Sequence, residues 1–221
     1  MLNKQNGNMY PWVTHTWNPI KGKCFHDCSY CYMKRFKRPQ PPVRIDEKEL
    51  KTDLGSGNKI FVGSSCDMWA SDIPENWIEK IMEKCLAHDN TYVFQTKNPD
   101  RYREVFEDSI ISLRDRFLLG VTIETNRYYS DYMGKAPYPC DRLFPLHFVS
   151  VEPIMDFDMD ILVDGMRYIN PEFVSIGADS KGHKLPEPEP GKIKDLIAGL
   201  SKFTEVKLKP NLKRIFVEAK P

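Results

Sequence analysis

The chain has 221 residues, of which 41% are hydrophobic and 29% charged, with 32 basic against 31 acidic side chains. This balance excludes an intrinsically disordered chain, and the lack of any apolar run of membrane-spanning length excludes an integral membrane protein. No secretion signal is recognisable in the first residues, so we expect a cytoplasmic protein. The length suits one α/β domain, and we predict a single domain over residues 1–221.

Positive charge is concentrated at the two ends of the chain. Residues 1–60 carry eleven Lys or Arg against five Asp or Glu, and residues 181–221 carry ten against five. The densest basic run is residues 34–38, which has Phe36 at its centre. A basic run with an aromatic residue is typical of a nucleic-acid surface, although a solvated helix face has the same composition.

Short runs of β-branched and aromatic residues predict buried strands, and segments with helical periodicity lie between them. Strands are predicted at residues 12–17, 59–62, 91–94, 117–123, 147–151, 172–176 and 205–208. Helices are predicted at residues 74–86, 99–107, 159–169 and 192–200. The alternation predicts an α/β fold, and the number of strands, short of the eight in a complete barrel, favours a partial (β/α)6-type TIM-like barrel.

The helix at residues 74–86 has the clearest signals. Asp72 is a candidate N-cap, with Pro74 and Glu75 in the first turn. Its predicted apolar stripe consists of Ile78, Ile81, Met82, Cys85 and Leu86. This stripe makes Cys85 a core residue, and Cys140 in a proline-rich loop is either incidental or a reactive thiol.

Near the other end of the chain, the alternating prolines of residues 185–190 indicate a stiff linker.

Polar side chains follow most of the predicted strands. They are Gly63 to Asp67, Gln95 to Lys97, Thr122 with Glu124 and Thr125, Glu152, Gly177 to Ser180, and Lys209 with Asn211. The carboxyl ends of parallel strands meet at one edge of a sheet, and ligands of α/β proteins bind there. We therefore predict a binding site formed by these strand ends.

Three of the six cysteines form a compact motif. Cys24, Cys28 and Cys31 have the spacing C-x3-C-x2-C, and in a reducing compartment such a cluster indicates metal ligands instead of disulfides. Three thiolates on one loop can hold three irons of a [4Fe-4S] cluster and leave the fourth iron free for a small molecule. The motif therefore predicts an iron–sulfur site with an exchangeable position.

This spacing, with the aromatic Tyr30 directly before the third cysteine, resembles the signature of the radical S-adenosylmethionine (SAM) superfamily. Further stretches resemble a small phage-type group of uncharacterised radical SAM proteins. These stretches are Thr16 to Pro19, Val62 to Ser65, Gln95 to Pro99, Gly120 to Glu124 and Ser150 to Pro153. The resemblance implies that SAM binds the free iron and is cleaved reductively to a 5′-deoxyadenosyl radical that takes a hydrogen atom from the substrate. It also implies an external reductant such as flavodoxin or ferredoxin.

The resemblance also implies residues that bind SAM. Ser64, Ser65 and Asp67 lie where the superfamily binds the amino group of SAM. A turn that caps a helix uses the same residue types, which is the alternative interpretation. At the next two strand ends, Lys97 and Thr122 resemble residues that hold the SAM carboxylate and ribose, and a ribose hydroxyl is expected to donate to Glu124. A buried carboxylate on iron needs a compensating positive charge, which Lys97 supplies.

Cys66 is a candidate catalytic residue, because the weak S–H bond of a thiol can donate a hydrogen atom to a carbon radical. Spore photoproduct lyase, a DNA-repair radical SAM enzyme, has a hydrogen-donating cysteine in a segment that resembles Ser65-Cys66-Asp67, although this chain departs from it after the cysteine. The alternative is a partly buried cysteine selected for its size.

Three functions remain open from the sequence. The first is a radical SAM enzyme, acting on a nucleic-acid base or nucleotide or else on a peptide or small metabolite. The second is an iron–sulfur electron-transfer or sensing protein that does not cleave SAM. The third is a zinc-stabilised nucleic-acid-binding module, with His26 or His15 completing a Cys3His site.

Overall fold

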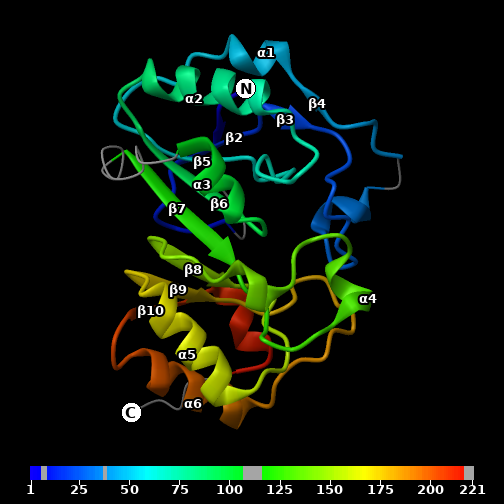
Figure 1. Cartoon of the computed structure of the whole chain (residues 1–221), viewed down its shortest axis with the longest axis vertical. Helices are drawn as coiled ribbons and strands as arrows, with labels where there is room; N and C mark the ends of the chain where they lie inside the picture. Colours follow the sequence, from blue (N-terminus) through cyan, green and yellow to red (C-terminus); the bar gives the residue numbers. More distant parts are fainter. Residues whose placement is uncertain (6–8, 37–38, 107–115, 217–221) are drawn as a thin grey trace.

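The computed structural model describes residues 1–5, 9–36, 39–106 and 116–216 (Figure 1). Within these residues the main sheet has eight strands in the order β1-β2-β5-β6-β7-β8-β9-β10. They are β1 (Asn3–Lys4), β2 (His15–Trp17), β5 (Lys59–Val62), β6 (Thr91–Thr96), β7 (Phe117–Thr122), β8 (Phe148–Val151), β9 (Phe173–Ile176) and β10 (Glu205–Leu208). Only β1 pairs antiparallel to its neighbour. The predicted α/β class is confirmed, and the described strands do not close the sheet, because β1 and β10 are its two edges.

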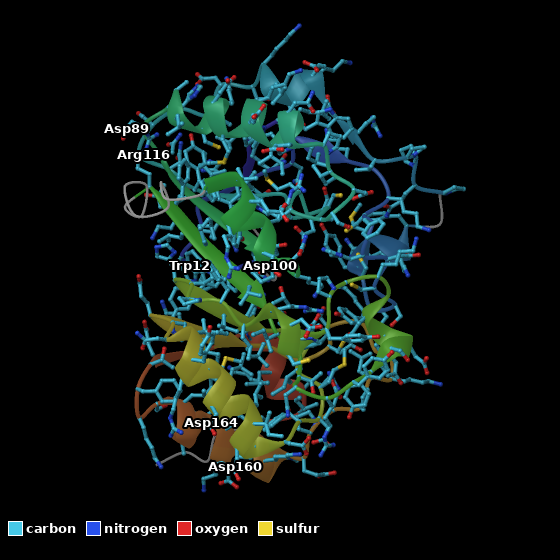
Figure 2. The ribbon with its side chains drawn as sticks, in the orientation of Figure 1. Trp12, Asp89, Asp100, Arg116, Asp160 and Asp164 are labelled. Atoms are coloured by element: carbon cyan, nitrogen blue, oxygen red, sulfur yellow. The ribbon has the colours of Figure 1, made fainter. Side chains whose placement is uncertain are left out.

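Six helices lie between the strands in the described part of the chain. They are α1 (Glu47–Leu50), α2 (Glu75–Leu86), α3 (Asp100–Phe106), α4 (Ser130–Met133), α5 (Met159–Ile169) and α6 (Pro190–Leu200). The longer ones, α2, α3, α5 and α6, pack on one face of the sheet. A second sheet pairs β3 (Ile20–Lys21) with β4 (Arg44–Ile45), and three 3-10 turns are η1 (Tyr32–Arg35), η3 (Pro139–Arg142) and η4 (Pro210–Arg214). In α5 the exposed Asp160 and Asp164 face solvent (Figure 2), and Leu162 and Met166 are buried in the main core.

Side chains alternate between two cores along each strand. In β8, Val149 and Val151 pack into the large core beneath the helices, whereas Phe148 belongs to a second, aromatic core on the opposite face. Residues 9–13 pack on that opposite face, where the Trp12 ring stacks on Tyr10 at 5.0 Å and meets Phe173 edge-on at 5.4 Å. This aromatic layer lies near the amino ends of the strands and leaves the carboxyl ends to polar residues.

Several predicted boundaries differ from the structure. In α2 the N-cap position is Pro74 and no side chain caps it, so the predicted role of Asp72 is wrong. The stripe is buried at Ile78, Ile81, Met82 and Cys85, but Leu86 is 45% exposed because the helix ends there. Helix α6 begins at Pro190, because proline is tolerated in a first turn where its missing N–H is not needed.

The proline-rich segment before α6 is packed and does not act as a free linker. Leu185 is buried against Cys28, Tyr30 and Met155, and the carbonyl oxygen of Pro186 accepts a hydrogen bond from Asp156. The predicted end of the helix at residue 107 lies outside the described residues, as do residues 37–38 of the basic run. None of the helices in the described part of the chain combines the length and apolar character that crossing a membrane requires.

Candidate functional site

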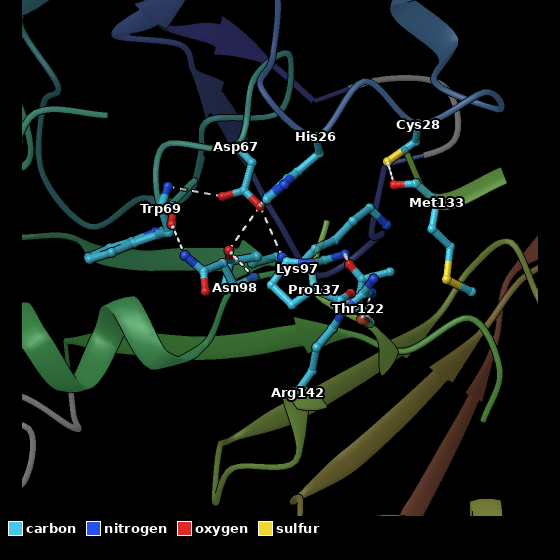
Figure 3. Close-up of polar contacts among 12 residues, drawn as sticks. His26, Cys28, Asp67, Trp69, Lys97, Asn98, Thr122, Met133, Pro137 and Arg142 are labelled. Atoms are coloured by element: carbon cyan, nitrogen blue, oxygen red, sulfur yellow. Dashed lines mark hydrogen bonds and ion pairs between the residues drawn. The ribbon is translucent and has the colours of Figure 1, made fainter. Parts of the chain in front are cut away.

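The cysteine loop, residues 24–31, lies at the carboxyl ends of β5, β6 and β7, and a contact between His26 and Asp67 anchors it there (Figure 3). His26 is 2% exposed, and its Nε2 atom lies 2.9 Å from the Asp67 carboxylate. The same carboxylate accepts hydrogen bonds from the Thr96 hydroxyl at 2.8 Å and from the backbone N–H groups of Lys97 and Trp69. Burial alone would raise the pKa of Asp67, but these donors hold it below its ordinary value.

Glu124 forms a second anchor at the end of β7. It is fully buried and accepts hydrogen bonds from Tyr30 of the cysteine loop, from Lys97 after β6 and from Arg142 of η3. Arg142 is also fully buried, and its Nη1 atom donates to the carbonyl oxygen of Thr122 at 2.7 Å. Although burial opposes ionisation, the Arg142 and Lys97 cations lower the pKa of Glu124 to about 2. The ionised Glu124 therefore connects the cysteine loop to the ends of both β6 and β7.

The segment around α4 covers the cysteine loop from the other side. The Cys28 thiol donates to the carbonyl oxygen of Met133 at 3.5 Å (Figure 3). Gly134 has a φ of 61°, a conformation that L side chains rarely adopt, and a Cβ atom at this position would overlap the carbonyl oxygen of His26. The close approach of α4 to the loop therefore depends on glycine at position 134.

The Cys24 thiol contacts Cys66, which follows β5. The interaction with the Cys66 thiol is the main reason that the pKa of Cys24 is lowered to about 6, and the backbone N–H of Asp67 lowers it further. The same contact raises the pKa of Cys66, which is 3% exposed. The structure thus brings the candidate hydrogen donor against one of the candidate cluster ligands.

The other two cysteines of the loop are held mainly as thiols. Burial raises the pKa of Cys28 to about 11, and it also raises that of Cys31, although the backbone N–H of Met33 is directed at the Cys31 sulfur. Three thiols on one anchored loop are the type of side chain that holds an iron–sulfur cluster in proteins. Among the described residues, no three His, Cys, Asp or Glu side chains stand close enough together to hold a single metal ion.

The histidines of the proposed zinc alternative make other contacts. His26 Nε2 faces Asp67, and His26 Nδ1 is buried without a hydrogen-bond partner in the described structure. His15 Nδ1 lies 3.0 Å from the Thr14 hydroxyl on the exposed edge of β2. Neither contact directs a histidine ring at a cysteine of the loop.

The remaining predicted SAM residues lie at neighbouring strand ends. The hydroxyl groups of Ser64 and Ser65 both donate to Asn18 Oδ1, at 3.0 and 3.1 Å, and the Ser65 backbone N–H donates to the same oxygen. The buried Thr122 hydroxyl accepts a hydrogen bond from Gln95 at 2.8 Å. The oxygens of Asp67 and Glu124 are largely occupied by protein donors, which the sequence did not indicate.

Sequence reasoning placed Glu152, Lys209 and Asn211 at the strand ends but did not indicate that they pair with one another. Lys209 donates to Glu152 at 2.6 Å and Asn211 donates to the same carboxylate at 3.0 Å. The Lys209 ammonium also lies 4.7 Å from the centre of the Tyr10 ring, and the Tyr10 hydroxyl lies 2.8 Å from Ser150 Oγ. Arg142 was missed. The alternation of side chains between the two faces of β8 and β10 was the one sequence signal that could have placed Glu152 and Lys209 on the same face.

A family model described as "Protein of unknown function (DUF5131)" matches residues 8–189. The chain belongs to the DUF5131 family. Among curated proteins none matches it. In this DUF5131 chain the matched residues include the whole cysteine loop, Asp67, Lys97, Glu124 and Arg142, whereas Lys209 and Asn211 lie beyond the match. The two anchors of the cysteine loop are therefore both within the family region.

Proposed function

We propose that this DUF5131 protein is a radical SAM enzyme whose [4Fe-4S] cluster is held by Cys24, Cys28 and Cys31. The observation that carries the proposal is the position of the cysteine loop. Two carboxylates, the partly buried Asp67 and the fully buried Glu124, fix the loop over the carboxyl ends of three parallel strands, where α/β proteins bind their ligands. A metal site that only stabilised the fold would not need this location.

When bound, a cluster of this kind supplies the electron that cleaves SAM and yields a 5′-deoxyadenosyl radical, which abstracts a hydrogen atom from the substrate. Lys97 presents an ammonium group beside Tyr30 and Glu124, where it would hold the SAM carboxylate. Ser64 and Ser65, fixed by Asn18, line the neighbouring strand end on the side proposed for the amino group. Thr122 and Glu124 remain the residues proposed for the ribose.

The architecture is proposed to be the partial barrel typical of this enzyme class. Seven parallel strands from β2 to β10 follow one another in sheet order without a swap, as the strands of a barrel do. Aromatic residues fill the face opposite the helices near the amino ends of the strands, and polar residues lie at the carboxyl ends. This distribution supports a barrel whose interior is filled at the amino ends of the strands and whose ligand site lies at their carboxyl ends.

We propose a nucleic-acid base or nucleotide as substrate, with a peptide or small metabolite as the alternative. The support is the excess of basic residues at both ends of the chain.

A second candidate function, an electron carrier or sensor, is favoured by the contact between Cys24 and Cys66. If Cys66 were a fourth ligand, the cluster would be closed by protein thiolates and would have no position for SAM. The two candidates therefore differ in whether the Cys66 sulfur binds iron.

Anaerobic reconstitution with iron and sulfide, followed by reduction in the presence of SAM, separates these functions. A radical SAM enzyme is expected to bind about four irons and four sulfides and to release 5′-deoxyadenosine. Iron and sulfide without 5′-deoxyadenosine would support the carrier, and zinc without sulfide would support the zinc module. Either of these two results would refute the proposed enzyme.

A further inference from the structure

The 3-10 turn η1 begins directly after Cys31 and presents its side chains to solvent. Tyr32 is 39% exposed, and Phe36, which follows the turn, is 50% exposed. Single exposed aromatic residues are common on protein surfaces, but neighbouring ones beside unpaired charge can form a recognition patch. The turn lies on the outer edge of the molecule, at the right in Figure 1.

Positive charge surrounds these rings. The Arg35 guanidinium lies 5.0 Å from the centre of the Phe36 ring and 6.0 Å from that of Tyr32, and it pairs with no carboxylate among the described residues. Lys34 and Lys23 share one carboxylate, that of Asp27, at 2.8 and 3.2 Å. We call Lys23, Tyr32, Lys34, Arg35 and Phe36 the Arg35 face; it has three cations and a single carboxylate beside it.

The Arg35 face is fixed relative to the cysteine loop. The backbone N–H of Lys34 donates to the carbonyl oxygen of Cys31 at 2.9 Å. The Tyr32 hydroxyl donates to the carbonyl oxygen of Ser64 at 3.0 Å, and Gln40 donates to that of Met33 at 3.1 Å. A partner bound here would therefore stand at a defined distance from the third cysteine.

We propose that the Arg35 face docks a one-electron carrier protein that has carboxylates around its redox group. This inference rests on the proposed function, because the carrier would deliver the electron that SAM cleavage consumes. Electron-transfer encounters bury small interfaces and depend on charge complementarity for their rate, and a compact basic patch with two exposed rings meets both conditions. The η1 turn of the Arg35 face also begins at the residue after Cys31, so the backbone connects the two directly.

A nucleic acid would be attracted by the same cations, but the rings are poorly placed to receive bases. The guanidinium of Arg35 lies over both Tyr32 and Phe36 and already occupies ring surface on which a base would stack. The observations therefore favour an acidic protein over a nucleic-acid strand at this site.

The test compares reduction of the reconstituted protein by an acidic flavodoxin with reduction by dithionite, which needs no docking. We expect Arg35→Glu to slow flavodoxin-driven bleaching of the cluster absorbance about tenfold at low salt, because a reversed charge repels the carrier. Arg35→Lys should keep most of the rate. Lys80→Glu is the matched control, since Lys80 is an exposed residue of α2 and undergoes the same change of charge.

Dithionite-driven release of 5′-deoxyadenosine should be equal in all these variants. Equal flavodoxin rates for Arg35→Glu and Lys80→Glu would overturn the docking proposal. So would loss of affinity for a single-stranded oligonucleotide in Arg35→Glu with flavodoxin unaffected, because the patch would then be a nucleic-acid surface. If the wild type released no 5′-deoxyadenosine with dithionite, the proposed function itself would fail, and flavodoxin binding measured by titration would still report on the face.

Discussion

At the scale of single residues, Glu124 joins three side chains, two of them charged. It binds Tyr30, Lys97 and Arg142, which belong to three different segments of the chain. The sequence predicted a residue that accepts a ribose hydroxyl, whereas the described contacts make Glu124 a connection between the cysteine loop and the sheet. Both roles are compatible, because a carboxylate has about four acceptor positions.

Replacing Cys24, Cys28 or Cys31 singly by alanine should abolish cluster assembly, because each would supply one of only three protein ligands. Iron and sulfide content after anaerobic reconstitution is the measurement. Cys140→Ala is the matched control, since Cys140 is exposed and outside the loop, and it should incorporate the cluster normally. Normal iron content in any of the three loop variants would refute the assignment.

Lys97→Ala should retain the cluster and weaken SAM binding about tenfold or more, since a hydrogen bond to a charged group contributes about 1.5 to 3 kcal/mol. Isothermal titration of the reconstituted protein with SAM measures the effect. Lys97→Arg keeps the charge and should recover part of the affinity. An unchanged dissociation constant in Lys97→Ala would remove this residue from the SAM site.

Cys66→Ala tests the hydrogen-donor hypothesis. We expect this variant to keep the cluster and to release 5′-deoxyadenosine, but to divert the substrate radical to abnormal or adduct products detectable by mass spectrometry. Cys85→Ala, at a fully buried thiol in α2, controls for the loss of a core sulfur atom. Normal product at the normal rate in Cys66→Ala would leave Cys66 as a packing residue, and loss of iron would instead indicate a fourth ligand.

At the scale of elements, the sequence predicted the long periodic segments well. The predicted ranges 59–62 and 205–208 match β5 and β10, and 159–169 matches α5. The elements β1, β3, β4, α1 and α4 were not predicted, because none of them carries the run of β-branched and aromatic residues or the apolar stripe that marks the predicted elements. Their conformations are set by contacts with distant parts of the chain.

For the candidate site, the sequence indicated which strand ends would be polar but not how their side chains pair. The contact between His26 and Asp67 joins residues 41 positions apart, and the contact between Arg142 and Glu124 joins residues 18 apart. Such pairs depend on the order of strands and on the path of long connections. Arg142 in particular lies in a proline-rich stretch with no pattern that would indicate a buried ion pair.

Gly134→Ala should weaken the packing of the α4 segment on the cysteine loop. The added methyl group would meet the carbonyl oxygen of His26 in a backbone conformation that alone costs about 1 to 3 kcal/mol. We expect a lower thermal midpoint and reduced cluster incorporation. Gly57→Ala is the matched control, because Gly57 also has a positive φ, 69°, but has no atom within 4 Å of an added Cβ. Equal effects of the two substitutions would show that the contact with the loop is unimportant.

At the scale of the whole molecule, the basic residues at both ends of the chain predict binding to nucleic acid. The logarithm of the affinity for single-stranded DNA should fall with the logarithm of salt concentration, with a slope near −0.7 for each phosphate contacted. Fluorescence anisotropy at several salt concentrations provides the measurement. A flat dependence would contradict a nucleic-acid substrate and favour a small metabolite.

The anchoring of the cysteine loop has a consequence for the lifetime of the protein in air. The loop is held by Asp67, Glu124 and the α4 segment, and each of these contacts is made by the polypeptide itself. Small zinc domains, by contrast, lose their fold together with their metal. Oxygen that destroyed the proposed cluster would therefore leave the loop in place, with its three cysteines still side by side on it. We therefore expect oxidative damage to be repairable by renewed delivery of iron and sulfide, without resynthesis of the chain.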